Sequence, residues 1–317
     1  MTTTHEAVTQ YVVFRQAAGA DFQATAQLLT AFCRVVGPDV EIADIPVERV
    51  RAFLDGHGPV TRYWHRKHSA LRGFYRYAVS HRLVELAPLP AIIPKAPPSF
   101  VPYLFTREEV HGLLEATSRY RTGHFHLEPH TFRALLLLLY GAGLRIGEAL
   151  HLTLADIDLP ATLVTIRDTK FYKTRVVPIG PDLCGALRHY AEQRQGGHAS
   201  QAAASAFFVD RKGSPLREGT VRRAFARLRR CAGISRTDGA RYQPRLHDLR
   251  HAFVGHRLTA WYRAGADVQR LLPQLSTYLG HGTIAATQAY LTMTPELLRE
   301  ACLRFGRYAD MEGPHER

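Results

Sequence analysis

Six prolines fall within the short stretch from Ala87 to Pro102, and they limit how the chain can fold more than any other feature. They are Pro88, Pro90, Pro94, Pro97, Pro98 and Pro102. Proline fixes φ and lacks an amide hydrogen, so a run this dense excludes a helix and favours an extended linker. A chain of 317 residues also exceeds what one hydrophobic core usually supports. We therefore expect a domain at residues 1–90, a linker at 91–105 and a second domain at 106–317.

The segment before the prolines has the pattern of a small helical domain. Apolar residues recur at helical spacing in residues 12–18, 22–36, 47–54 and 61–81, with Gly-Pro breaks between them. The last of these helices has an apolar face and a basic face. Along it lie Arg62, Arg66, Lys67, Arg72 and Arg76, with Trp64, His65 and Tyr75 beside the arginines. Such a basic face is either solvated or in contact with phosphates.

The second domain mixes helices with a few strands. A capping box, Thr106 to Glu109, predicts a helix to Ser118. Further helices are predicted at residues 131–140, 145–150, 181–195, 218–231, 246–263 and 295–305. Alternating β-branched residues predict a hairpin of strands 162–167 and 175–179 around a polar turn that contains Lys170, and a short strand at 207–210. The fold class expected is mainly α with a small antiparallel β-sheet.

The charge of the chain points to a polyanionic partner. Lys and Arg number 41 against 28 Asp and Glu, a formal net charge of +13, which makes nucleic acid the leading candidate. No apolar run reaches the length that spans a bilayer, and no secretory signal opens the chain, so we expect a cytoplasmic protein without a membrane partner. The four cysteines are far apart and form no Cys-x-x-Cys pair, which argues against a disulfide framework or a zinc ribbon.

A set of chemically capable residues is spread along the second domain. Arg145 follows a Gly-Ala-Gly turn and begins a helix, His247 and Arg250 share a helix face at i, i+3 spacing, and His281 stands nine residues before Tyr290. Each residue alone has an ordinary explanation. Arg145 could form an ion pair with the residue three positions on, and His247 could be a core histidine. Lys170 could be a solvated turn residue and Tyr290 a packing residue. The order Arg, Lys, His-x-x-Arg, His, Tyr is far more specific than any member.

That set resembles the active site of the tyrosine recombinases, the phage integrase family. The resemblance covers about residues 106–305 and, in domain order, the helical segment before them. The matching stretches are residues 141–150 around Arg145, the Lys170 hairpin running into Arg175-Val-Val-Pro178, Leu246-His-Asp-Leu-Arg-His251, and Leu279-Gly-His281 with Tyr290. One departure is visible, because the span from Arg250 to His281 is longer than in the familiar members.

The resemblance implies a core-binding (SAM-like) helical domain, an α+β catalytic domain and a defined chemistry. Tyr290 would attack a DNA phosphate held by Arg145 and Arg250 and form a 3′-phosphotyrosyl intermediate without metal, nucleotide or other cofactor. His247 is the candidate acceptor of the tyrosine proton, and the resemblance assigns the general acid to Lys170. His281 would hydrogen-bond the phosphate.

The same resemblance implies the partners. The first partner is double-stranded DNA with specific recombination sites. The second is further copies of the chain, as a tetramer on two duplexes, or sister recombinases in place of those copies. The final helix at 295–305 would dock on a neighbouring subunit or pack on its own domain. The candidate DNA-contacting residues are Arg62, Arg66, Lys67, Arg72, Arg76, Lys173, Arg222, Arg223 and Arg227. The task expected is recombination of a bacterial or mobile-element DNA at the nucleoid, with integration, excision, transposition and dimer resolution left open.

Three other functions fit parts of the sequence. A type IB topoisomerase shares the tyrosine chemistry, but the His-x-x-Arg pair and the separate helical module favour a recombinase. His247-Asp-Leu-Arg-His251 mimics the His-Glu-x-x-His of zinc hydrolases, although an arginine between the ligands opposes a dication. His124, His126 and His130 are a second metal-like cluster. A DNA-binding regulator without catalysis is the third alternative, and the presence of all six catalytic residue types argues against it.

Overall fold

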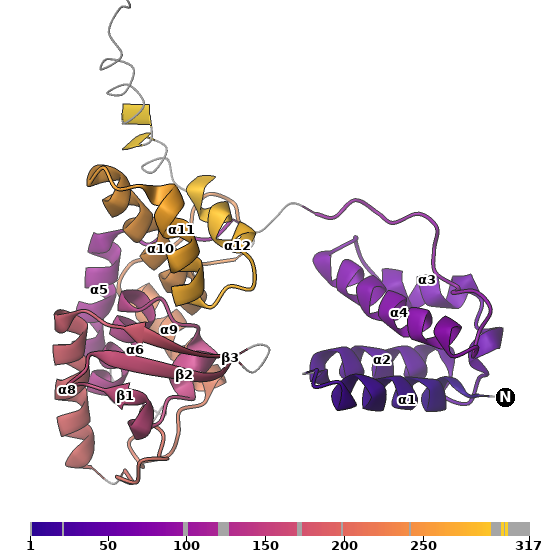
Figure 1. Cartoon of the computed structure of the whole chain (residues 1–317), viewed down its shortest axis with the longest axis horizontal. Coiled ribbons are helices and arrows are strands. Elements are labelled where there is room, and N and C mark those ends of the chain that lie inside the picture. The colour runs from indigo at the N-terminus through magenta and orange to yellow at the C-terminus, as the bar shows by residue number, and fades with distance from the viewer. Residues whose placement is uncertain are drawn as a thin grey trace, which may run out of the picture. The chain divides into compact units, whose positions relative to one another are not determined.

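The computed structural model divides the chain into two compact units, residues 1–100 and 101–317, called here the N-terminal and C-terminal units (Figure 1). The structure describes residues 2–20, 22–97, 101–119, 127–169, 173–197, 199–240, 242–292, 299–300 and 302–303. The division falls inside the stretch that the sequence marks as a linker. The three-part domain assignment itself stays a prediction.

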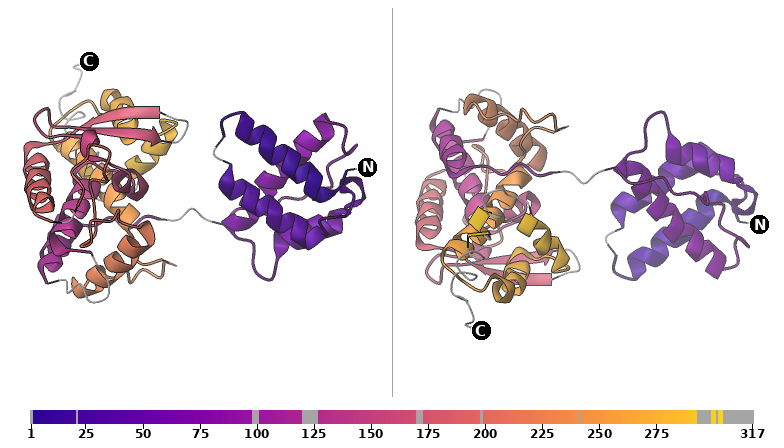
Figure 2. Two further views of the ribbon diagram at one scale, coloured as in Figure 1. Left: turned by 90° about the horizontal axis from the view of Figure 1, so that it is seen from below. Right: turned by 90° about the horizontal axis from the view of Figure 1, so that it is seen from above.

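The N-terminal unit is a helical bundle, seen from two further sides in Figure 2. Its helices are α1 (Thr4–Ala17), α2 (Gln23–Val36), α3 (Val47–Asp55) and α4 (Arg62–Ser80), with a 3-10 turn at Ile42–Asp44. A capping box between Thr3 and Glu6 starts α1 at Thr4, earlier than the predicted start at Val12, because it satisfies two helix-end amides that apolar periodicity does not reveal. The core gathers Leu29, Phe32 and Phe74.

Helix α4 divides its surface differently from the prediction. Trp64 and Tyr75, which the sequence placed beside the arginines, are buried in the core, whereas Tyr63 is 52% exposed. Arg62 and Arg72 are exposed as predicted. Trp64 is fixed by a 2.8 Å hydrogen bond from its indole Nε1 to Asp55 of α3. The error arose because aromatic rings suit both a stacking surface and a core, and only packing decides between them.

The C-terminal unit mixes helices with one small sheet. Its helices are α5 (Arg107–Ser118), α6 (Pro129–Gly141), α7 (Ile146–Leu150), α8 (Pro181–Gln195), α9 (Glu218–Cys231), α10 (Leu246–Arg263), α11 (Val268–Leu279) and α12 (Ala285–Gln288), with 3-10 turns at Leu154–Asp156 and Ala289–Thr292. The strands are β1 (Ile157–Asp158), β2 (Leu163–Thr169) and β3 (Lys173–Pro178). The predicted class, mainly α with a small antiparallel sheet, is confirmed. None of the helices in the described residues is both long and apolar enough to span a membrane.

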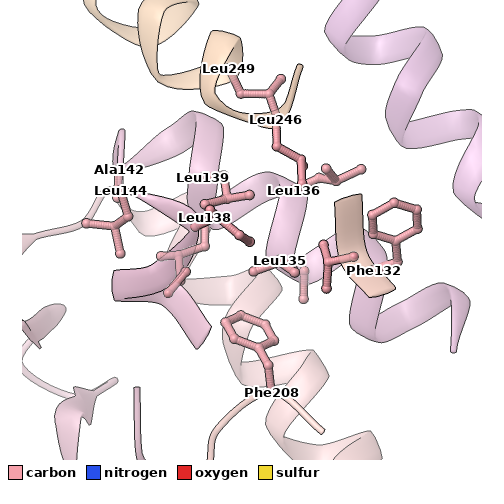
Figure 3. Close-up of a cluster of buried hydrophobic side chains, with 14 of the residues drawn as sticks. Phe132, Leu135, Leu136, Leu138, Leu139, Ala142, Leu144, Phe208, Leu246 and Leu249 are labelled. Carbon is pink, nitrogen blue, oxygen red and sulfur yellow. The ribbon is translucent and has the colours of Figure 1, made fainter. Parts of the chain in front are cut away.

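Helix α6 lies at the centre of the core of the C-terminal unit, as its almost wholly apolar sequence predicts. Leu135 and Leu138 are fully buried, and Leu246 and Leu249 at the start of α10 belong to the same cluster, with Phe208 packed from another direction (Figure 3). This packing holds the first turn of α10, which carries the His-x-x-Arg residues, against α6.

The register of the sheet decides which hairpin residues face inward. Strands β1, β2 and β3 are antiparallel neighbours in that order, with Val164 opposite Val177 and Ile166 opposite Arg175. Val164, Ile166 and Val177 are buried. Since partners across a sheet share a face, Arg175 points to the same inner side.

Helix α11 lies between α10 and His281, in a segment for which the sequence predicts no element. Val268, Leu272, Leu275 and Leu279 are buried at helical spacing against α10. Pro273 lies inside this helix, where its missing amide hydrogen removes one backbone hydrogen bond.

One further prediction differs from the structure, and another is not tested by it. The predicted strand at 207–210 is wrong: the segment forms only isolated bridges, from Ala206 to Thr153 and from Val209 to Pro215, so it is not part of the sheet. The predicted helix at 295–305 falls largely outside the described residues, as do His124 and His126.

Candidate active site

Three arginines from different elements meet at the C-terminal end of α11. Arg175, Arg250 and Arg145 donate hydrogen bonds to the successive carbonyl oxygens of residues 278–280, at 3.0, 2.7 and 3.2 Å. The last carbonyls of a helix have no partner within the helix and carry the negative end of its dipole. Cations from β3, α10 and the start of α7 therefore converge on one helix end.

Arg250 is the most enclosed of the three. Its side chain is 1% exposed, and its Nη1 also donates to the carbonyl of Gly143 at 2.7 Å. Burial, reinforced by the charge of Arg145, lowers its pKa to about 10. These two hydrogen bonds to carbonyls tie the loop before α7 and the end of α11 to α10. Arg145, by contrast, has a side chain that is 38% exposed, and so it is the more accessible guanidinium.

Glu148 is a buried carboxylate shared by two of these arginines. It forms ion pairs with Arg145 at 2.7 Å and with Arg175 at 2.8 Å. Burial opposes its ionisation, but hydrogen bonds and charge from Arg175, then from Arg145, hold its pKa down at about 2. Glu148 therefore stays ionised at neutral pH and keeps the two guanidiniums at fixed positions.

Two glycines allow the backbone to pass close to this cluster. Gly143 and Gly280 have φ of +61° and +65°, a region that favours glycine. A Cβ on Gly143 would lie 2.5 Å from the ring of Phe253, and one on Gly280 would lie 2.7 Å from Arg175 Nη1. The glycines before Arg145 and His281 are thus required by both conformation and space.

Tyr290 lies beside the arginine cluster, buried among the side chains of α10 and α11. It is 5% exposed, and its hydroxyl is 2.8 Å from Nδ1 of His251. Burial raises the pKa of Tyr290, while the charges of Arg250 and Arg145 act in the opposite direction. A hydroxyl with a raised pKa needs a nearby proton acceptor before it can act as a nucleophile at neutral pH.

The histidine in contact with Tyr290 differs from the predicted one. In the part of the chain that the structure describes, no hydrogen bond joins His247 to Tyr290; the ring of His247 meets that of His251 edge-on, with centroids 4.8 Å apart. His281 stacks over Tyr290 with centroids 6.3 Å apart, and its Nδ1 is 2.8 Å from Thr287 Oγ1. Burial first, and then neighbouring positive groups, lower the pKa of His247, His251 and His281 to about 4 each.

The structure therefore brings five of the six predicted catalytic residues together. They are Arg145, His247, Arg250, His281 and Tyr290. The sixth, Lys170, lies outside the described residues, and so does the side chain of Lys173.

Three further members of the cluster were missed as site residues by sequence reasoning. The sequence indicates Glu148 only as an ion-pair partner of Arg145, His251 only as a zinc ligand or the end of a matching stretch, and Arg175 only as part of a matching stretch. A signal existed for His251, since i, i+4 spacing puts it on the face of His247. None existed for Arg175, whose inward direction depends on the register of the hairpin.

The predicted DNA-contacting residues divide by accessibility. Arg62, Arg66, Arg72 and Arg76 of α4 and Arg222, Arg223 and Arg227 of α9 are exposed. Lys67 is held instead against α3: its Nζ donates to the carbonyl of Phe53 at 2.6 Å and lies 4.7 Å from the centre of that ring. On α9, Arg229 is buried and donates to the carbonyl of Ile234 at 2.6 Å, so it serves the fold.

The zinc-hydrolase alternative has little geometric support in the described residues. No three His, Cys, Asp or Glu side chains there group in a way that would hold a metal ion. The position that this alternative assigned to a zinc ligand, His251, faces Tyr290.

Residues 104–296 match the model of the phage integrase family. The chain belongs to this family. Within it the chain is a tyrosine recombinase: a site-specific DNA recombinase that cleaves and rejoins DNA strands through a catalytic tyrosine. The predicted family, function and enzyme class are confirmed, and the type IB topoisomerase alternative is not favoured.

Two relatives illustrate the likeness in sequence. The y4rB protein of Sinorhizobium fredii, named as an integrase/recombinase, is 37% identical over 311 residues, which are 97% of this chain and 98% of that protein. The tyrosine recombinase XerD of Mycobacterium tuberculosis is 34% identical over 232 residues, 73% of this chain and 70% of XerD.

Solved structures share the fold of this tyrosine recombinase. The integrase of the transposon Tn1549 has a TM-score of 0.71 and 16% identity, over 96% of this chain and 100% of that one. The XerH site-specific recombinase has a TM-score of 0.65 and 20% identity, over 88% of this chain and 78% of that one. At such identities the likeness concerns the fold alone.

Proposed function

We propose that this tyrosine recombinase uses Tyr290 to attack a DNA phosphodiester held by Arg145 and Arg250, and so forms a 3′-phosphotyrosyl intermediate. The observation that carries the proposal is the convergence of these two arginines, with Arg175, on one helix end beside the buried hydroxyl of Tyr290. The phosphodiester gathers negative charge on its nonbridging oxygens during attack, and fixed cations stabilise that charge.

The surroundings of Arg145 and Arg250 indicate a different role for each. Arg145 is partly exposed and bridged to Glu148, so its remaining donors can bind a phosphate oxygen without losing the ion pair. Arg250 is buried and anchored on two carbonyls, which supports a fixed positive charge rather than a moving contact. His281 would hydrogen-bond a nonbridging oxygen through Nε2, since its Nδ1 is engaged by Thr287 Oγ1.

The leaving 5′ oxygen needs a proton, and we assign its donor to Lys170 in the connection between β2 and β3. The assignment rests on the resemblance to the family, since Lys170 lies outside the described residues. The phosphotyrosyl bond retains the energy of the broken phosphodiester, so rejoining requires no nucleotide.

The partner proposed is double-stranded DNA with specific recombination sites. Among the solved neighbours, the Tn1549 integrase is bound to circular intermediate DNA and XerH to a palindromic substrate. The exposed arginines of α4 and α9 supply the positive charge that phosphate contacts need. The proposal includes a helical core-binding domain at 1–90, a linker at 91–105 and a catalytic domain at 106–317. The assembly proposed is a tetramer that acts on two duplexes at the nucleoid.

A covalent-trapping experiment tests the chemistry. The protein is incubated in EDTA with a pool of nicked duplexes whose central segment has a random sequence, then denatured, and DNA linked to protein is recovered and sequenced. We expect adducts that share a sequence, with the tyrosine on the 3′ phosphate, and no adduct from Tyr290→Phe. An adduct that persists in Tyr290→Phe would falsify the mechanism. Joining of two recovered duplexes distinguishes a recombinase from an enzyme that only relaxes a supercoiled plasmid.

A further inference from the structure

Among the groups around the hydroxyl of Tyr290, which include Arg250, the expected chemistry leaves one nitrogen, Nδ1 of His251, without a role. His251 Nδ1 lies 2.8 Å from Tyr290 Oη, and the two rings are tilted by 38° with centroids 5.3 Å apart. The distance is that of a hydrogen bond, and a general base must lie within this reach of the proton that it takes. His247, the expected base, makes no such contact in the described part of the chain.

The surroundings of His251 favour its neutral form. Its ring is partly buried between Tyr290 and His247, and the charged or titratable groups that bear on it are Arg245, Arg250, His247 and His281. Burial first, then the arginines and His281, lower its pKa to about 4. A neutral imidazole at physiological pH has a free lone pair on one ring nitrogen, which is the condition for accepting a proton.

We propose that His251, and not His247, accepts the proton of Tyr290 when the tyrosine attacks DNA. This inference rests on the proposed function, since it assigns the base for that same attack. The neutral ring carries its hydrogen on Nε2 and receives the hydrogen bond of the tyrosine at Nδ1.

The step balances in both directions. As the Tyr290 Oη–P bond forms, the phenolic proton passes to His251 Nδ1 and the imidazole becomes an imidazolium. The bond from phosphorus to the 5′ oxygen breaks, and that oxygen takes its proton from the general acid. In rejoining, the 5′ hydroxyl attacks phosphorus, the P–Oη bond breaks, and His251 returns its proton to Tyr290.

His247 then has a separate role one helical turn away. Its ring meets that of His251 edge-on, so it packs against the base rather than against the tyrosine. We assign it to positioning His251. This assignment makes the two histidines distinguishable, because loss of a base and loss of a neighbour change the pH dependence differently.

The first test needs no DNA. In protein labelled with ¹⁵N at histidine, NMR reports which ring nitrogen of His251 carries hydrogen, and Tyr290→Phe identifies the resonance by removing its partner. We expect Nδ1 to be unprotonated in the wild type. A hydrogen on Nδ1 means that His251 donates to the tyrosine and cannot take its proton, which overturns the proposal.

The second test measures the single-turnover rate of adduct formation on a duplex recovered from the random pool. His251→Asn keeps an acceptor near Nδ1 but cannot be protonated, and we expect its rate to fall by about a hundred- to ten-thousandfold. The residual rate should rise about tenfold per pH unit, because the ionised tyrosine becomes the attacking species. Wild type and His247→Asn should instead keep a flat profile between about pH 6 and pH 8.

The outcomes separate this inference from the proposed function. If Tyr290→Phe still forms the adduct, the proposed function fails. If Tyr290→Phe forms no adduct but His251→Asn reacts at a rate close to that of wild type, only the assignment of His251 fails. The same holds if Tyr290→Phe forms no adduct and His247→Asn acquires the pH dependence expected of His251→Asn. Added imidazole should restore part of the rate of His251→Gly and none of the rate of Tyr290→Phe, and equal rescue of both would overturn the assignment.

Discussion

The guanidinium of Arg250 donates a hydrogen bond of 2.7 Å to the carbonyl oxygen of Leu279. This contact joins the helix of the His-x-x-Arg residues to the last turn of α11, and the next residues lead to His281 and Tyr290. Because Arg175 and Arg145 bind the flanking carbonyls, the end of α11 is held by three cations. The position of the nucleophile therefore depends on the same arginines that are proposed to bind the phosphate.

Replacing Arg250 with lysine is expected to reduce both activity and stability. Lysine cannot reach Gly143 and Leu279 together, so one buried carbonyl loses its partner, and the free energy of unfolding should fall by about 2–4 kcal/mol. The rate of adduct formation should fall by about a hundred- to a thousandfold. Arg145→Lys is the matched control: its side chain is partly exposed, so it should lose rate with a smaller loss of stability. Equal melting temperatures for wild type and Arg250→Lys would contradict the anchoring role.

Gly280→Ala tests whether space at the arginine cluster matters. The added Cβ meets Arg175 Nη1 at 2.7 Å and the residue also has φ of +65°. We expect a loss of about 2–4 kcal/mol together with loss of adduct formation. Gly265→Ala separates the two causes, since Gly265 has φ of +69° and nothing within 4 Å of the added carbon. It should cost only the conformational strain, about 1–2 kcal/mol. Similar losses at both positions would show that the contact with Arg175 is unimportant.

The stability of the C-terminal unit should fall in mild acid. His247, His251 and His281 have a pKa of about 4 in the folded chain, below the ordinary value of 6.5. The unfolded chain binds these protons first, so their contribution is complete above about pH 6.5 and is lost as the pH falls towards 4, with at most about 1.4 kcal/mol per pH unit for each histidine. Thermal melts across this window measure the slope. His251→Asn should reduce it, and an unchanged slope would contradict the buried neutral state.

Two basic residues of α4 should respond to substitution in opposite ways. Arg72 is exposed, so Arg72→Ala should weaken binding of the recovered duplex and reduce the dependence of log affinity on log salt by about one unit. Lys67→Ala should leave that dependence unchanged but lower the stability of the N-terminal unit by about 1–2 kcal/mol, because its contacts with Phe53 are lost. Fluorescence anisotropy at several salt concentrations and thermal melting measure the two effects. A reduced salt dependence in Lys67→Ala would restore this lysine as a phosphate contact.

Tyr75→Phe should not weaken the N-terminal unit. The hydroxyl of Tyr75 is buried and has no hydrogen-bond partner among the described residues. Removing an unpaired buried hydroxyl is expected to leave stability unchanged or to raise it by about 1 kcal/mol. Tyr190→Phe is the contrasting control, since the hydroxyl of Tyr190 donates to the carbonyl of Phe207 at 3.1 Å and should cost about 1–2 kcal/mol when lost. Destabilisation by Tyr75→Phe would indicate a bound water at that hydroxyl.

Local sequence determined the class of the fold and the identity of most of the candidate site. Helical spacing, capping boxes and β-branched alternation depend on neighbours a few residues apart, so the helices from α2 to α10 and the hairpin were predictable. The order of Arg145, His247, Arg250, His281 and Tyr290 was enough to indicate the family. The proline run likewise marked where the two units divide.

Only the tertiary structure decided which of these residues touch. The register of β2 and β3 turns Arg175 inward, burial gives Glu148 two guanidinium partners, and the packing of α10 against α11 sets His251 rather than His247 on the tyrosine hydroxyl. These choices depend on contacts between segments more than a hundred residues apart in some cases, and on the need to pair every buried charge. A pattern of nearby residues holds no information about these long-range contacts or about the pairing of buried charges. The sequence alone therefore identified the chemistry but not its geometry.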